Sequence, residues 1–98
     1  MAITVDIRDE QGGLVQREYE GSFELAAALS DLDDAEYPML RFVDPYGTTY
    51  FSSLQMIGVI PELERLAKAS PRPTLDKVLQ MARRVRAKPH TFLVFVGD

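Results

Sequence analysis

A run of five consecutive apolar residues, Phe92-Leu93-Val94-Phe95-Val96, limits the folds open to this 98-residue chain more than any other feature. Neighbouring side chains of a β-strand point to opposite faces of the sheet, so a strand made of this run is apolar on both faces. Such a strand is stable only where it is covered or strongly flanked on both sides. The sequence therefore predicts a β-sheet in which residues 92–96 form a central strand.

The beginning of the sequence predicts a β-hairpin. Ile3, Val5 and Ile7 alternate with polar residues, which is the period-two pattern of a half-buried strand. Residues 9–13 contain two glycines that can adopt a positive φ in a turn. Residues 14–20 are then expected to return as the second strand.

A second hairpin is predicted in the middle of the chain. Met39–Val43 is predicted to be a short strand, and Thr48–Phe51, which is rich in residues of high β-propensity, is predicted to pair with it. Between them, the run Asp44-Pro45-Tyr46-Gly47 has the residue types that a type I turn prefers at its four positions.

Helical signals surround these strands. Ser22 is a preferred N-cap residue, and the residues after it predict a helix that begins at Phe23 and ends before Pro38, with a solvated acidic loop from Asp31 to Glu36. Thr74 is predicted to cap a later helix that ends before Pro89. The apolar residues of this later helix recur at near-ideal helical spacing: Leu75, Val78, Leu79, Ala82 and Val85.

Pro61 leaves two alternatives for residues 53–69. Ser52 and Gln55 have the spacing of a capping box, which predicts a helical start near residue 53. A proline inside a helix costs about 3 kcal/mol or more, whereas at the first helical position it costs little. We therefore favour a short turn near residues 54–59 followed by a helix over 61–69. A continuous, kinked helix is the alternative.

Together these elements predict a single α+β domain over residues 1–98. The expected order is ββαββααβ, with a mainly antiparallel sheet of about five strands packed against two to three helices. The composition, with 46% hydrophobic and 27% charged residues, is that of an ordinary globular protein. We expect the chain to fold without a partner.

The sequence offers little material for catalysis. There is no cysteine, so thiolate nucleophiles and zinc–thiolate sites are excluded, and His90 is the only histidine. The acidic residues Asp31–Glu36 lack the glycine and glutamate spacing of a calcium loop. No nucleotide-binding fingerprint is present. We therefore expect no enzymatic activity, no metal site and no cofactor.

The location of the protein can also be predicted. The first twenty residues contain Asp6, Arg8, Asp9 and Glu10 and lack the apolar core of a signal peptide. No apolar run approaches the roughly 18–20 residues needed to cross a bilayer. We expect a soluble, cytoplasmic protein that does not bind membranes.

Charge is distributed unevenly along the chain. Residues 1–70 have a net charge of −8, whereas residues 71–98 have a net charge of +4. Helical spacing places Lys77 and Arg84 on one outward stripe, opposite the apolar face of their helix. The overall charge of −4 and the pI near 4.9 argue against nucleic acid as a partner. The stripe is expected to pair within the chain or with an acidic protein surface.

The middle third of the sequence also carries a resemblance. The segment from Leu40 to Phe51, with the pattern LRxxDPYGxTxF, followed by Leu54-Gln55-Met56 and a short charged helix, resembles a set of small bacterial proteins that have an Asp-Pro-Tyr-Gly turn and no assigned activity. In size and character those proteins are similar to the immunity proteins that neutralise bacterial toxins. The resemblance implies a compact fold without catalytic residues, and it carries over no site residues.

Two functional hypotheses follow. The first is a non-enzymatic interaction module of inhibitor or immunity type, which binds a protein partner, such as a toxin or a second copy of itself, by complementary charge. Its expected contact residues are Asp31, Asp33, Asp34, Glu36, Tyr46, Lys77 and Arg84. The alternative is a small-ligand-binding domain with a pocket between sheet and helices, in which His90 or Tyr50 is the polar group.

Overall fold

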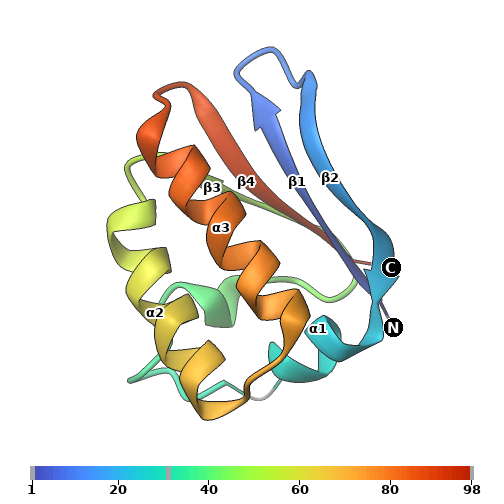
Figure 1. Cartoon of the computed structure of the whole chain (residues 1–98), viewed down its shortest axis with the longest axis vertical. Coiled ribbons are helices and arrows are strands. Elements are labelled where there is room, and N and C mark those ends of the chain that lie inside the picture. Colours follow the sequence, from blue (N-terminus) through green and yellow to red (C-terminus); the bar gives the residue numbers. More distant parts are fainter. Residues whose placement is uncertain (1, 31, 98) are drawn as a thin grey trace.

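The computed structural model describes residues 2–30 and 32–97, with the side chains of residues 18–21 excepted. It confirms the α+β class. The elements run along the chain in the order β1 (Ile3–Asp9), β2 (Leu14–Ser22), α1 (Phe23–Ala28), the 3-10 helix η1 (Leu40–Phe42), β3 (Thr48–Ser52), α2 (Met56–Ala69), α3 (Pro73–Ala87) and β4 (Thr91–Gly97) (Figure 1).

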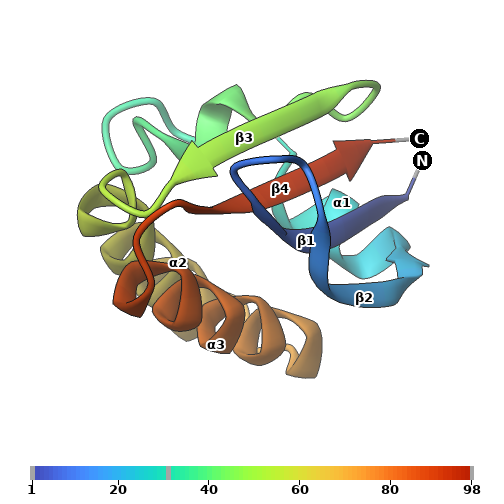
Figure 2. The same ribbon diagram turned by 90° about the horizontal axis from the view of Figure 1, so that it is seen from above.

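The strands form one antiparallel sheet in the order β2-β1-β4-β3. β4 lies between β1 and β3, with Phe95 opposite Val5 on one side and Thr49 on the other. Leu93, Val94 and Phe95 are fully buried. The prediction of a central strand at residues 92–96 is therefore confirmed, and so is the N-terminal hairpin. β2 and β3 form the two margins of the sheet (Figure 2).

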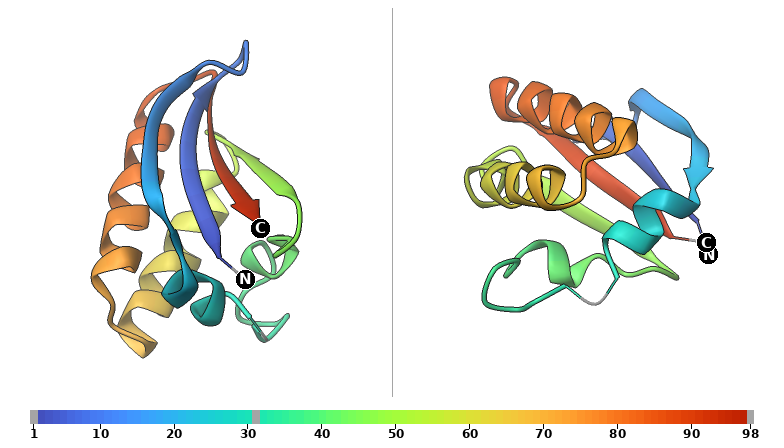
Figure 3. Two further views of the ribbon diagram at one scale, coloured as in Figure 1. Left: turned by 90° about the vertical axis from the view of Figure 1, so that its right-hand side faces the viewer. Right: turned by 60° about the horizontal axis from the view of Figure 1, so that its bottom comes forward.

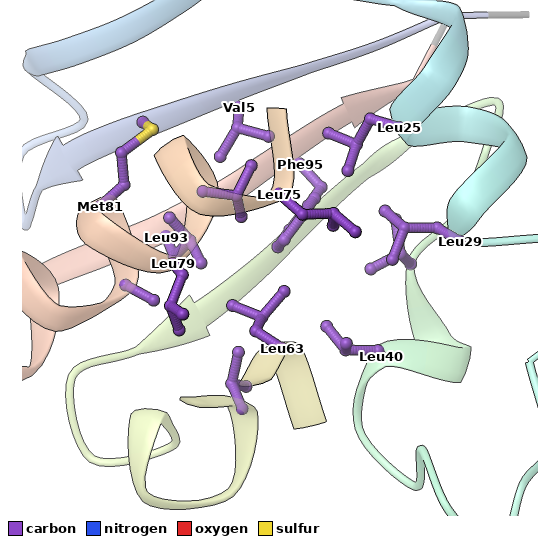
Figure 4. Close-up of a cluster of buried hydrophobic side chains, with 14 of the residues drawn as sticks. Val5, Leu25, Leu29, Leu40, Leu63, Leu75, Leu79, Met81, Leu93 and Phe95 are labelled. Atoms are coloured by element: carbon purple, nitrogen blue, oxygen red, sulfur yellow. The ribbon is translucent and has the colours of Figure 1, made fainter. Parts of the chain in front are cut away.

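One face of the sheet supports the helices. α2 and α3 pack side by side across this face, and α1 lies near one end of the strands (Figures 1 and 3). Figure 4 shows the resulting core, in which Val5 and Phe95 of the sheet meet Leu63 of α2 and Leu75 of α3. The opposite face carries the alternate residues of the strands and is covered by none of these helices in the described part of the chain.

The prediction of a strand at Met39–Val43 is wrong. These residues form η1 and its flanks, and the sheet partner of β3 is β4. The N–H groups of Met39 and Leu40 bind the Glu62 carboxylate, which takes the place of a strand partner for them. Leu40 is fully buried and Val43 nearly so, because the tight turn aims both into the core. Within residues 2–30 and 32–97 the sheet therefore has four strands, and the Asp44–Gly47 turn joins η1 to β3.

The favoured interpretation of Pro61 is also wrong, and the alternative of one continuous helix is the one that the structure shows. α2 runs from Met56 to Ala69 with Pro61 inside it. Its apolar face, which includes Val59, Leu63 and Leu66, is buried against the core along the whole length. The free energy of this burial, about 1.5–3 kcal/mol for each large side chain, offsets the cost of the proline.

The predicted start of α1 is confirmed, whereas the predicted start of α3 is displaced. The Ser22 hydroxyl accepts a hydrogen bond from the Leu25 N–H at 2.9 Å and caps α1. The capping-box residues Ser52 and Gln55 exchange their two expected bonds, although they close the turn just before α2. α3 begins at Pro73, so its N-cap is Arg72 and the predicted cap at Thr74 is two residues late.

Candidate functional site

Between α1 and β3 the chain forms an exposed segment rich in carboxylates. We call the exposed residues Asp33, Asp34, Glu36, Phe42, Asp44 and Tyr46 the acidic–aromatic surface. Phe42 and Tyr46 are 60% and 74% exposed, and they place two large aromatic side chains beside these carboxylates. The sequence predicts four of these six residues as contacts, and it also predicts Asp31, which lies outside the described residues.

Two of the carboxylates shape the backbone beneath them. Asp33 accepts a hydrogen bond from the Ala35 N–H at 2.7 Å through its side chain. Asp44 accepts one from the Tyr46 N–H at 2.8 Å in the same manner. Such local bonds are typical of aspartate in turns. They hold the intervening residues in defined positions on the surface.

The buried carboxylate of Glu62 binds the main chain of this segment. Glu62 of α2 is only 4% exposed. Its Oε1 accepts hydrogen bonds from the N–H groups of Met39 at 3.1 Å and Leu40 at 2.9 Å, and its Oε2 accepts a second contact from Met39. Hydrogen bonds to an ionised acceptor are roughly twice as strong as neutral ones. Glu62 therefore fixes the start of η1 against α2.

Arg65, one turn further along α2, makes a second attachment. Its guanidinium donates to the carbonyl oxygen of Glu36 and lies 5.7 Å from the ring centroid of the buried Tyr37. The close packing also involves Gly58, where a Cβ atom would collide with the sulfur of Met39. α2 thus holds the segment at several points.

Arg41 joins the acidic and aromatic parts of the surface. Its guanidinium lies 4.2 Å from the centroid of the Phe42 ring, and its Nη1 lies 3.8 Å from the Asp34 carboxylate. The Thr49 hydroxyl accepts a hydrogen bond from the Asp44 N–H at 3.0 Å, and this bond attaches the Asp44–Gly47 turn to β3. The surface carries four carboxylates, and the guanidiniums of Arg41 and Arg65 lie beside it, so its net charge stays negative.

The predicted basic stripe lies on a different side of the molecule. α3 and the acidic segment occupy opposite margins in both views of Figure 3. Arg84 donates to the side-chain oxygen of Gln16 at 2.8 Å, and the neighbouring Arg83 lies 3.2 Å from Glu64. Lys77 is exposed on the same helix. The structure therefore separates Lys77 and Arg84 from the acidic–aromatic surface.

The cavity that the structure describes is lined by neither polar group of the ligand hypothesis. A cavity of about 260 Å³ is lined by Ile3, Ala26, Leu29, Ser30, Arg41, Val43 and Pro45. Tyr50 instead projects from β3, 55% exposed and edge-on to Phe92. His90 is exposed, has a positive φ of 66°, and lies 3.2 Å from Glu10.

The strongest electrostatic cluster lies on the helix-free face of the sheet. Asp6 is fully buried and is bound by Arg17 at 2.8 Å and by Arg8 at 2.8 Å. Burial alone would raise the pKa of Asp6, but the hydrogen bonds and charges of Arg17 and Arg8 outweigh it and hold the pKa below its ordinary value of about 3.8. The two arginines lie on the two strands of the N-terminal hairpin, so this cluster stabilises that hairpin.

Sequence reasoning missed the supporting residues. Glu62 falls between Val59 and Leu66 on the apolar face of α2, and a charged residue on such a stripe signals a buried partner. Phe42 falls in the strand predicted at Met39–Val43, and that prediction gave no indication of its exposure. Arg65 gave no signal, because an arginine on an exposed helix face is ordinary.

Other kinds of site find no support in the described residues. Within the ranges 2–30 and 32–97, no group of three acidic or histidine side chains could hold a metal ion. No helix in that part of the chain is long and apolar enough to cross a membrane. Comparisons with protein-family models, curated proteins and solved structures find no match to this chain.

Proposed function

We propose that this protein is a non-enzymatic interaction module of inhibitor or immunity type, which binds a basic protein partner through the acidic–aromatic surface. The observation that carries this proposal is the buried Glu62, which holds an exposed, negatively charged segment in a fixed conformation. A buried carboxylate is costly unless it is well bonded. Here its hydrogen bonds fix Met39 and Leu40, and the segment that they hold places Leu40 in the core and the acidic–aromatic surface towards solvent.

A fixed surface of this composition suits binding. Ordering a flexible loop during association weakens the binding, and a segment that is already ordered avoids this cost. Phe42 and Tyr46 supply large, exposed rings that can enter pockets on a partner. The carboxylates Asp33, Asp34 and Glu36 attract a basic partner and speed its approach.

The arrangement of polar groups favours binding over catalysis. His90 is exposed and its acidic partner, Glu10, is also exposed. An acid–base pair in a catalytic site is normally placed beside a cleft where a substrate can be enclosed. The residues that line the cavity include neither of these two groups.

Reversing the charge of the surface is the first test. In the variant Asp33→Lys/Asp34→Lys/Glu36→Lys, we expect the affinity for a protein captured by the wild type to fall more than about tenfold at low salt. The difference should narrow at high salt, because exposed charges are screened. Titration of the purified pair at several salt concentrations measures both effects.

A variant with the same charge change elsewhere provides the control. Glu10→Lys/Glu24→Lys/Asp76→Lys reverses three exposed carboxylates that lie outside the surface. It should retain most of the affinity, provided that circular dichroism shows both variants to be folded. Equal loss of binding in the two triple variants, or none in either, would contradict the proposed contact surface.

A further inference from the structure

The two margins of the sheet differ in chemistry. β2, at one margin, has the sequence LVQREYEGS, which includes three charged residues, and its register with β1 is irregular. Charges and irregularities of this kind protect an edge strand from pairing with another chain. β3, at the other margin, has the sequence TTYFS, with no charge and no proline. This edge therefore lacks the protection that the first one has.

The main chain of β3 is oriented to accept another strand. The Ser52 N–H donates to the side chain of Gln55 at 2.8 Å, so this N–H points away from β4. Main-chain direction alternates along an antiparallel strand, and Tyr50 and Thr48 therefore face the same way. The N–H and C=O groups of Tyr50 thus point towards the outer margin, where no strand of the described chain is paired.

Large exposed apolar side chains lie in β3 and on both sides of it along the chain. Tyr50 is 55% exposed in the middle of β3. Tyr46, just before the strand, is 74% exposed, and Leu54, just after it, is 70% exposed. Ile57 follows at 59%. Exposed apolar residues also occur in β2, where Leu14 is 51% and Val15 37% exposed, so the absence of charge along β3 is what distinguishes this edge.

We propose that β3 pairs with β3 of a second copy of this chain, antiparallel, with the two-fold axis at Tyr50. The two Tyr50 residues then exchange two main-chain hydrogen bonds, and Thr48 of each copy lies opposite Ser52 of the other. In this register Tyr46 of one copy comes beside Leu54 of the other, so both exposed groups gain a partner. The same patch serves both copies, as a two-fold interface requires.

This dimer goes beyond the proposed function and does not depend on it. The pairing uses β3 and its apolar flanks and shares only Tyr46 with the acidic–aromatic surface, whereas the carboxylates of Asp33, Asp34 and Glu36 take no part in it. A strand of five residues with a few apolar flanking side chains is small beside the roughly 1,600 Å² of a standard interface. We therefore expect reversible dimerisation in the micromolar range.

Replacing Tyr50, which lies on the two-fold axis, by a positively or a negatively charged residue tests the proposal. Sedimentation velocity of the wild type from about 1 μM to 1 mM should show a shift from monomer towards dimer. Tyr50→Lys and Tyr50→Glu should each remain monomeric throughout, because like charges then face each other across the axis. An equimolar mixture of these two variants should dimerise again, since the introduced lysine of one copy then faces the introduced glutamate of the other.

The other margin supplies the matched control. Leu14→Lys introduces the same charge at an exposed apolar residue of β2 and should dimerise like the wild type. Thermal unfolding identifies any variant that does not fold. A wild type that stays monomeric across the whole concentration range would overturn the proposal. So would folded Tyr50 variants that dimerise normally, or a mixture that fails to recover.

Discussion

Glu62→Ala is expected to lower the free energy of unfolding by about 3 kcal/mol, because a buried hydrogen-bond donor that loses its acceptor costs about 1–3 kcal/mol. The N–H groups of Met39 and Leu40 both lose the carboxylate that binds them. Their amide hydrogens should then exchange with solvent much faster. Urea denaturation gives the stability change, and exchange measured by NMR gives the local effect.

Two further substitutions in α2 serve as controls for the stability loss expected of Glu62→Ala. Glu62→Gln keeps an oxygen acceptor but loses the charge, so we expect a smaller loss of about 1–2 kcal/mol. Glu64→Ala removes an exposed carboxylate two residues away and should change stability by less than about 0.5 kcal/mol. If Glu62→Ala were as stable as Glu64→Ala, the supporting role of Glu62 would be wrong.

Asp6→Asn is the second substitution with a large expected effect, a loss of about 2 kcal/mol at pH 7. The buried carboxylate of Asp6 is bound by Arg8 and Arg17, and its removal leaves both guanidiniums without their counter-charge. Breaking a fully buried ion pair costs about 3–5 kcal/mol. The cost here is smaller because both arginines retain some contact with water.

The pH dependence gives this prediction a distinct signature. The pKa of Asp6 is lowered in the folded protein, so its stabilising effect is present above the ordinary value of about 3.8. The effect is lost as the pH falls through the lower folded value. The stability difference between the wild type and Asp6→Asn should therefore be constant from pH 7 to about pH 5 and should close in stronger acid. A difference that persists unchanged in strong acid would contradict this view.

Local patterns predicted most of the framework. The alternation of Ile3, Val5 and Ile7 and the apolar run at residues 92–96 specify strands whose neighbours then follow from burial. In α3 the apolar spacing from Leu75 to Val85 is nearly ideal, and all of these predicted core residues are buried. Short-range signals suffice where the pattern and the tertiary packing agree.

The errors arose where a distant residue decides the local structure. The β-propensity of Met39–Val43 was real, but the Glu62 carboxylate, 22 residues beyond Leu40, binds the N–H groups that a strand would use. Pro61 disfavours a helix locally, but the burial of Val59 and Leu66 on either side of it depends on the whole helix and outweighs that cost. Tertiary contacts outweighed local preference in both segments.

The candidate site could be predicted only in part, because some of its contacts also depend on residues that are distant in the sequence. The carboxylates of Asp33, Asp34 and Glu36 were visible as a charge cluster, and Tyr46 as the tip of a turn. The contacts of Arg41 with Asp34 and with the Phe42 ring depend on the fold. The position of Lys77 and Arg84 on another side likewise follows from the placement of α3, which charge along the sequence does not reveal.

Hydrogen–deuterium exchange of the chain alone and in complex with its captured partner tests the proposed function most directly. We predict that the amides of residues 32–46 exchange more slowly in the complex, while those of α3 are unchanged. Glu62→Ala should reduce this protection and the affinity together, although it alters no exposed charge. Protection confined to α3, with residues 32–46 exchanging as they do in the free protein, would contradict the assignment of the acidic–aromatic surface.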